Sequence, residues 1–124
     1  MTNGELVRRL WAHFDAGDFD AATPILWEDF VAEWPQSRER MRGRENFLAV
    51  NRNYPGKSRC TVLRIVEAGD LVVSEVKVVT DGKAPIFAIS FFEVREGRLA
   101  RAVEYWGDSY EPPAWRSPWV ERFS

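Results

Sequence analysis

The second half of the chain contains four strand-like segments, and short turns join each one to the next. The segments are residues 61–67, 71–80, 84–94 and 99–108. Their side chains follow the two-residue period of β-strands, and the turns Ala68–Asp70, Asp81–Gly82 and Arg95–Gly97 separate them. Asp81–Gly82 is also a strong signal for a two-residue hairpin. Because connections this short cannot cross over a sheet, the segments must form antiparallel neighbours.

The first half has the helical period instead. Apolar residues recur at the spacing of one helix face at Leu6, Val7, Leu10, Trp11 and Phe14. They predict an amphipathic helix over residues 3–16 that ends at Gly17. Asp18 is placed to cap a second short helix, and Thr23–Pro24 resembles the start of another helical turn before Ile25.

Two further elements lie before the four strands. Residues 30–34 alternate as a short strand that Pro35 stops, and residues 36–42 form a polar loop with room for a brief strand. Residues 43–53 return to the helical period. Helices first and a hairpin-linked sheet later define an α+β class, and no linker or repeat divides residues 1–124 into more than one domain.

The charge pattern excludes several classes of function. The formal net charge is −2, and Glu39 interrupts the arginines of residues 38–44, so this segment predicts a solvated loop or an anion contact rather than a nucleic-acid surface. A single cysteine, Cys60, cannot form an internal disulfide or a thiolate zinc cluster. No signal peptide or long apolar run is present, so we expect a cytoplasmic protein with no membrane partner, no metal and no cofactor.

The strand over residues 84–94 is apolar on both of its faces. One face carries Ile86, Ala88, Ser90 and Phe92, and the other carries Phe87, Ile89 and Phe91. Three helical segments cannot cover both faces of the sheet. We therefore expect a homodimer through the outer face that Phe87, Ile89 and Phe91 form.

Three local strings carry a family resemblance: AGDFDAA, PQSRERMRGRENF and EVREGRLARAVEYWGD. In this order, residues 6–108 resemble the nuclear transport factor 2-like superfamily, and within it the SnoaL-like (polyketide-cyclase-like) proteins. The resemblance implies a cone-shaped α+β fold with N-terminal helices in the concavity of a curved antiparallel or mixed sheet. It also implies a deep apolar cavity and frequent dimerisation.

The catalytic sets of two branches of this superfamily are largely missing. The carboxylate base, tyrosine donor and protonated aspartate of the ketosteroid isomerase branch fall at Trp34, Leu10 and Ser90. In the limonene epoxide hydrolase branch, the arginine and second aspartate fall at Val76 and Val78. Its water-binding tyrosine and asparagine fall at Ala32 and Trp34, and Glu104 alone keeps its carboxylate.

Glu104 is the strongest candidate for a catalytic residue. It shares a strand face with Ala102 and Trp106, which the resemblance makes the cavity face. Poor solvation would raise the pKa of this carboxyl toward values useful to a general acid or base. Alternatively, Glu104 pairs with Arg101 or Arg98, or lies at an open rim.

Two further residues could assist it. His13 is a proton shuttle by its chemistry, although Arg9 and Gly17 place it on the polar side of its helix. Asp108 is either a second acid near the cavity mouth or a turn residue beside Gly107.

An aromatic and apolar set would line the cavity or fill the core: Trp34, Phe47, Tyr54, Val76, Val78, Ser90, Phe92 and Trp106. Three functions therefore stay open. The chain binds a small apolar molecule, or is an isomerase, dehydratase or cyclase that uses Glu104, or is a non-catalytic dimeric interaction module. Residues 109–124 hold the aromatic residues Tyr110, Trp115 and Trp119, and three prolines that stiffen the chain. We therefore expect this tail to pack over the cavity mouth or onto a partner subunit.

Overall fold

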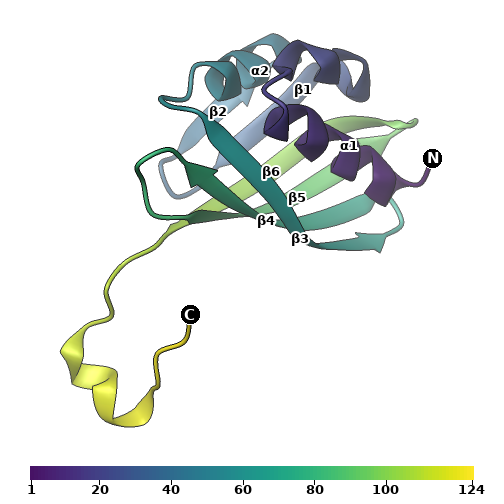
Figure 1. The fold of residues 1–124 in the computed structure, drawn as a ribbon. Helices are drawn as coiled ribbons and strands as arrows, with labels where there is room; N and C mark the ends of the chain where they lie inside the picture. Colours follow the sequence, from purple (N-terminus) through teal and green to yellow (C-terminus); the bar gives the residue numbers. More distant parts are fainter.

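The chain folds as two α-helices and a 3-10 helix against one face of a six-stranded sheet (Figure 1). The computed structural model describes residues 1–124. The helices are α1 (Asn3–Asp15), η1 (Phe19–Ile25) and α2 (Arg44–Arg52). The strands are β1 (Leu26–Trp34), β2 (Glu39–Arg42), β3 (Ser58–Ala68), β4 (Leu71–Thr80), β5 (Ile86–Arg95) and β6 (Arg98–Asp108).

The sheet is mixed, with the strand order β2-β1-β6-β5-β4-β3. Only β1 and β6 are parallel, and the other neighbours are antiparallel. Register shifts within the β3–β4, β5–β6 and β1–β6 pairs increase the local twist and bend the sheet. This arrangement confirms the predicted α+β cone fold.

Helix α1 is fixed to β3 at both of its ends. Thr2 and Glu5 form a capping box that satisfies the first backbone N–H groups of the helix. The N–H of Gly4 donates to Glu67 Oε1 at 2.7 Å, near the end of β3. At the other end of the helix, Asp15 accepts the N–H of Cys60 at 2.8 Å. Helix α1 therefore runs antiparallel to β3 across the inner face of the sheet.

One local prediction for the first half is confirmed in part, and another is wrong. A second short helix does begin after Asp18, which is its N-cap residue, but the Asp18 side chain makes no capping hydrogen bond. This helix, η1, continues through Pro24 to Ile25. No helix restarts there, because Leu26 already belongs to β1 and is paired with Leu99 of β6. Pairing within the sheet outweighs the local helix-start signal at this position.

The predicted two-residue hairpin at Asp81–Gly82 is also wrong. The β4–β5 connection covers residues 81–85 and includes Pro85, which has no N–H to donate to a ladder. A tight two-residue turn occurs instead at Glu96–Gly97, where both residues have positive φ (46° and 77°). These are the dihedral angles that such a turn requires.

The alternation in β4 and β5 correctly predicts the inner face of the sheet. Val72, Ser74, Val76, Val78 and Thr80 of β4 are all buried. The outer face of β5 has no cover within this chain, and Phe87 and Phe91 remain 39% and 38% exposed. None of the helices has the length and apolar character needed to span a membrane.

Residues 109–124, called the arm below, extend away from the rest of the chain on the side of the sheet opposite the helices (Figure 1). The arm contains the short 3-10 helix η2 (Ala114–Trp119). Tyr110, Trp115 and Trp119 are between 72% and 78% exposed. Within a single chain, the arm therefore does not pack over the cavity described below.

Candidate functional site

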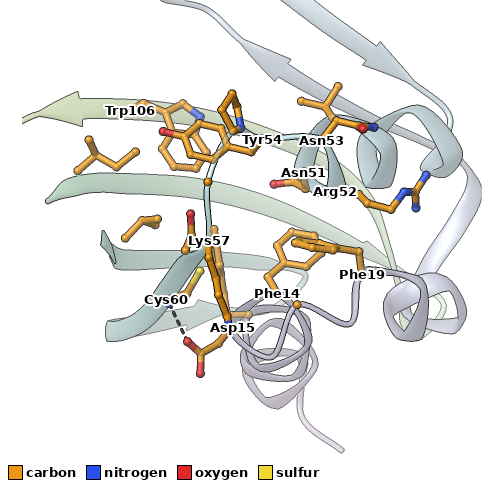
Figure 2. A pocket seen from close by; sticks show the side chains of 18 of the residues that line it. Phe14, Asp15, Phe19, Asn51, Arg52, Asn53, Tyr54, Lys57, Cys60 and Trp106 are labelled. Atoms are coloured by element: carbon orange, nitrogen blue, oxygen red, sulfur yellow. Dashed lines mark hydrogen bonds between the residues drawn. The ribbon is translucent and has the colours of Figure 1, made fainter. Parts of the chain in front are cut away.

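A cavity of about 600 Å³ opens between the ends of α1 and α2 and the adjacent ends of β3 to β6 (Figure 2). Most of its wall is apolar: Trp11, Phe14, Phe19, Trp34, Tyr54, Cys60, Val78, Ile86 and Trp106. A concave, mainly apolar space of this size is typical of a site for a small molecule.

Two glycines that follow the ends of α1 and α2 shape the mouth of the cavity. Gly17 ends α1 at a φ of 72°, so the chain turns away and leaves the last turn of the helix beside the opening. Gly56, at a φ of 90°, lies in the loop after α2. A Cβ on Gly56 would lie 2.8 Å from a methyl carbon of Thr80, so only glycine lets this loop approach β4 so closely.

The structure divides the predicted lining residues into two groups. Trp34, Tyr54, Val78 and Trp106 line the cavity. Phe47, Val76, Ser90 and Phe92 do not line it and are fully or almost fully buried in the core. Phe47, for example, packs against Phe30 with ring centroids 4.8 Å apart. Their proposed contact with a ligand remains a prediction that this geometry does not favour.

Trp34 and Trp106 form one wall of the cavity. Their rings meet edge to face, with centroids 5.9 Å apart and an interplanar angle of 80°. The Nε1–H of Trp34 donates to Glu104 Oε1 at 3.1 Å. The Nε1 of Trp106 is buried and has no hydrogen-bond partner. The Trp106 ring therefore faces the cavity with its carbon atoms, and its N–H is enclosed by protein.

Glu104 is buried behind this wall and is only 3% exposed. Ser90 Oγ lies 2.6 Å from Glu104 Oε2 and donates to it, in addition to the Trp34 contact. Burial raises the pKa of the Glu104 carboxyl, and the hydrogen bonds from Ser90 and Trp34 oppose this effect in part. Burial therefore favours the neutral, protonated form of this carboxyl.

The ion pairs suggested for Glu104 do not form. Arg101 points to the outer face, where its Nη2 pairs with Glu33. The guanidinium of Arg98 lies over the ring of Trp27, 4.7 Å from its centroid. The period of the strand explains Arg101, which is three positions from Glu104 and therefore points to the opposite face. Between Arg98 and Glu104 the register shift adds one residue to β6, since Glu93 pairs with Arg101 and Val94 with Leu99, and this reverses the alternation.

The three predicted catalytic residues do not come together. Glu104 is not part of the cavity lining and reaches it only through the Trp34 indole. Asp108 is exposed at the rim, about 13 Å further along the same strand at about 3.3 Å per residue. His13 is half-buried on α1 and does not line the cavity. Their roles in a reaction therefore remain predictions.

The sequence analysis missed a polar cluster at the rim near Cys60. Arg59 and the Cys60 N–H both donate to Asp15, and they hold the pKa of its carboxyl below the usual range. Burial raises the pKa of the Cys60 thiol to about 11, and the Asp15 charge adds to this effect. Helix and strand periods could not reveal the cluster, because its members lie 44 and 45 positions apart in the sequence.

The cavity also has polar groups contributed by α2 and the loop that follows it. These are Asn51, Arg52, Asn53 and Lys57, which the sequence analysis did not predict. No three His, Cys, Asp or Glu side chains lie close enough together to hold a metal ion. The site is therefore an apolar cavity with a polar rim and a buried acid behind one wall.

Comparison with known proteins places the chain in a family. A family model described as the SnoaL-like domain matches residues 7–102. The chain therefore belongs to the SnoaL-like family of nuclear transport factor 2-like proteins. A search of curated proteins finds no match.

Two similar solved structures cover nearly the whole chain. A candidate ketosteroid isomerase from Kribbella flavida DSM 17836 is 30% identical, with a TM-score of 0.88 over 98% of this chain and 90% of that one. An NTF-2 like protein of unknown function from Burkholderia xenovorans LB400 is 36% identical, with a TM-score of 0.81 over 97% and 94%. Both matches must include most of the arm.

The fold is also similar to that of an LEH-like epoxide hydrolase from M. tuberculosis. The two chains are 22% identical, with a TM-score of 0.70 over 84% of this chain and 81% of that one. At this level of identity, the similarity concerns the fold alone.

Proposed function

We propose that the chain binds a small, mainly apolar molecule in the cavity between α1, α2 and the sheet. The observation that carries this proposal is the cavity of about 600 Å³ whose wall is largely aromatic and aliphatic. Burial of apolar ligand surface against such a wall supplies about 25 cal/mol per Å². The polar groups at the rim would orient the ligand.

The relative from Kribbella flavida supports an apolar ring compound as the ligand. It is described as a candidate ketosteroid isomerase and is 30% identical to this chain. The residues that would perform that reaction are absent here, since Trp34 and Ser90 stand at two of the expected acidic positions. We therefore carry over to this chain only the class of ligand, an apolar ring compound, and not the isomerase reaction.

Fluorescence titration tests the binding proposal. The probe is 1-anilinonaphthalene-8-sulfonate, and the readouts are its own emission and quenching of the tryptophans in the cavity wall. Tyr54→Ala is the test variant, because Tyr54 lines the cavity and is 42% exposed. Tyr105→Ala is the matched control, because Tyr105 is 41% exposed but lies outside the cavity.

We expect Tyr54→Ala to weaken probe binding about tenfold, which corresponds to about 1.4 kcal/mol, and Tyr105→Ala to leave it unchanged. The opposite pattern would mean that the probe binds the outer sheet face. Absence of saturable binding to the unaltered protein would contradict the proposal.

A second candidate function is general acid/base catalysis by Glu104 in an isomerisation, dehydration or cyclisation of an apolar carbonyl compound. The observation that favours it is a buried carboxyl of raised pKa, hydrogen-bonded to a residue of the cavity wall. The probe reaction is exchange of the α-protons of 2-decalone in D₂O, followed by NMR. We expect faster exchange with the unaltered protein and none of this enhancement with Glu104→Gln. Equal rates for the two proteins would exclude the role of Glu104.

We also propose that residues 1–124 form one domain and that two copies pair through the outer sheet face. Phe87 and Phe91 are more than a third exposed, and Ile89 between them is half-buried. Phe91 makes an edge-to-face contact with Tyr105 of β6, which extends the apolar patch. Sedimentation that shows only a monomer at micromolar concentration would contradict this pairing.

A further inference from the structure

Two apolar surfaces of the chain have no partner within it. The first is the outer face of β5 and β6, where Phe87, Phe91 and Tyr105 are 38% to 41% exposed. The second is the arm, where Trp115 and Trp119 are 72% and 78% exposed. Large exposed aromatic side chains that gather in this way mark an interaction surface.

The arm has internal order but little contact with its own chain. Within it, Arg122 pairs with Glu111 at 3.3 Å, and the Arg116 guanidinium lies 5.9 Å from the centre of the Trp115 ring. The hydrogen bond from Ser109 to the Pro85 carbonyl fixes only the root of the arm. None of its residues lines the cavity. The position of the arm is therefore not explained by packing within one chain.

The two surfaces are continuous. Strand β6 carries Tyr105 on the outer face and runs directly into the arm after Asp108. Figure 1 shows that the arm then extends on the helix-free side of the sheet, which is the side of that face. A second protein molecule that packed on the outer face would therefore lie beside the arm.

We propose that the arm crosses to a second copy of this chain and that arm and outer face together form one interface. In a two-fold dimer the same patch serves both copies, so each arm would lie against the partner while the sheets face each other. This inference rests on the proposed pairing through the outer face. It adds that the arm supplies much of the binding energy, through Trp115 and Trp119.

Two observations favour a second copy over other partners. The matches to the Kribbella and Burkholderia structures cover 98% and 97% of this chain and therefore extend into the arm, so an arm is not peculiar to this sequence. The arm carries Glu111, Glu121, Arg116 and Arg122, so its side chains have no net charge to attract an anionic membrane or nucleic acid. Its only helical segment, η2, has six residues and is too short to lie as an amphipathic helix in a lipid interface.

Sedimentation equilibrium of the full chain measures the contribution of the arm. The test variant is Trp115→Ala with Trp119→Ala, and the control is Tyr54→Ala, which removes an exposed aromatic ring outside both surfaces. We expect the dimer dissociation constant to rise about 100-fold in the arm variant, because buried tryptophans dominate interfaces of this kind. We expect no change in the control. Far-ultraviolet circular dichroism should be the same for all three proteins, because the arm does not support the fold of its own chain.

A mixed dimer of ¹³C-labelled and unlabelled chains shows directly where the arm lies. Isotope-filtered NOEs from the Trp115 and Trp119 rings to the other copy are expected. A dimer that Phe91→Arg dissociates but the arm variant leaves unchanged would overturn the arm inference and leave the proposed pairing intact. A protein that stays monomeric at all concentrations would overturn both. If the monomer sediments with phosphatidylcholine vesicles and the arm variant does not, the arm binds a lipid surface and the inference is overturned.

Discussion

Replacement of Glu104 by glutamine tests the physical description of the buried acid. Glutamine has nearly the same shape, and its Oε1 can accept the N–H of Trp34. The glutamine NH₂ group would take the place of Glu104 Oε2 and would need an acceptor. The nearest one is Ser90 Oγ, which lies 2.6 Å from Glu104 Oε2 in the unaltered protein. At low pH, where Glu104 is neutral in both states, we expect the variant to be less stable by about 1 kcal/mol.

The effect of pH follows from the direction of the pKa shift. Burial raises the pKa of Glu104 in the folded chain above the ordinary value of 4.5. Between the two values the unfolded chain has lost a proton that the folded chain keeps, so the free energy of unfolding falls as pH rises. The slope is about 1.4 kcal/mol per pH unit and ends where the folded-state carboxyl titrates. Glu104→Gln lacks this slope.

The free energy of unfolding of Glu104→Gln should therefore rise relative to that of the unaltered protein as pH increases from about 4.5. The assay is urea denaturation between pH 4 and pH 8 at one protein concentration, because a dimer would make stability depend on concentration. Glu39→Gln, an exposed carboxyl on edge strand β2, controls for the loss of a charge and should follow the unaltered protein. A constant difference between Glu104→Gln and the unaltered protein across this range would refute the description of Glu104 as a carboxyl whose pKa is raised.

Three further predictions concern the cavity and the core. Alkylation of Cys60 at pH 8 should be about 100-fold slower than that of a simple thiol, because a pKa of about 11 leaves little thiolate; a rate like that of glutathione would contradict it. Gly56→Ala should cost more stability in thermal unfolding than Gly82→Ala, since both have positive φ but only Gly56 meets a neighbour, Thr80, at 2.8 Å; equal losses would disprove the close approach. Phe47→Ala should cost about 3 to 5 kcal/mol in urea denaturation, because Phe47 is 1% exposed; a loss below 1 kcal/mol would show that it is not a core residue.

The local periods of the sequence were sufficient for most of the fold. The spacing of Leu6, Leu10 and Phe14 identified α1, and the alternation in β4 identified the face that is buried. Both patterns work because the period of a helix or strand fixes which side chains share a face. The Thr23–Pro24 signal failed because β1 pairs from Leu26 onward with β6, a strand distant in the sequence. The Asp81–Gly82 signal failed because the β4–β5 ladder stops at the Val78–Ile86 pair, with Pro85 in the connection.

The candidate site depended more on tertiary structure. The strand period places Glu104 and Trp106 on the same face, and the family resemblance implied that this is the face toward the helices. The sequence could not show that Trp106 lines the cavity while Glu104 is buried behind Trp34, because depth along a strand depends on where α1 and α2 end. Only the folded chain brings Asp15 to Arg59 and Cys60. Only the folded chain shows that the arm is attached to its own body at its root, through Ser109 and Pro85, while Trp115 and Trp119 stay exposed. Period determines direction, whereas distance from the cavity and the choice of partner follow from how the elements pack.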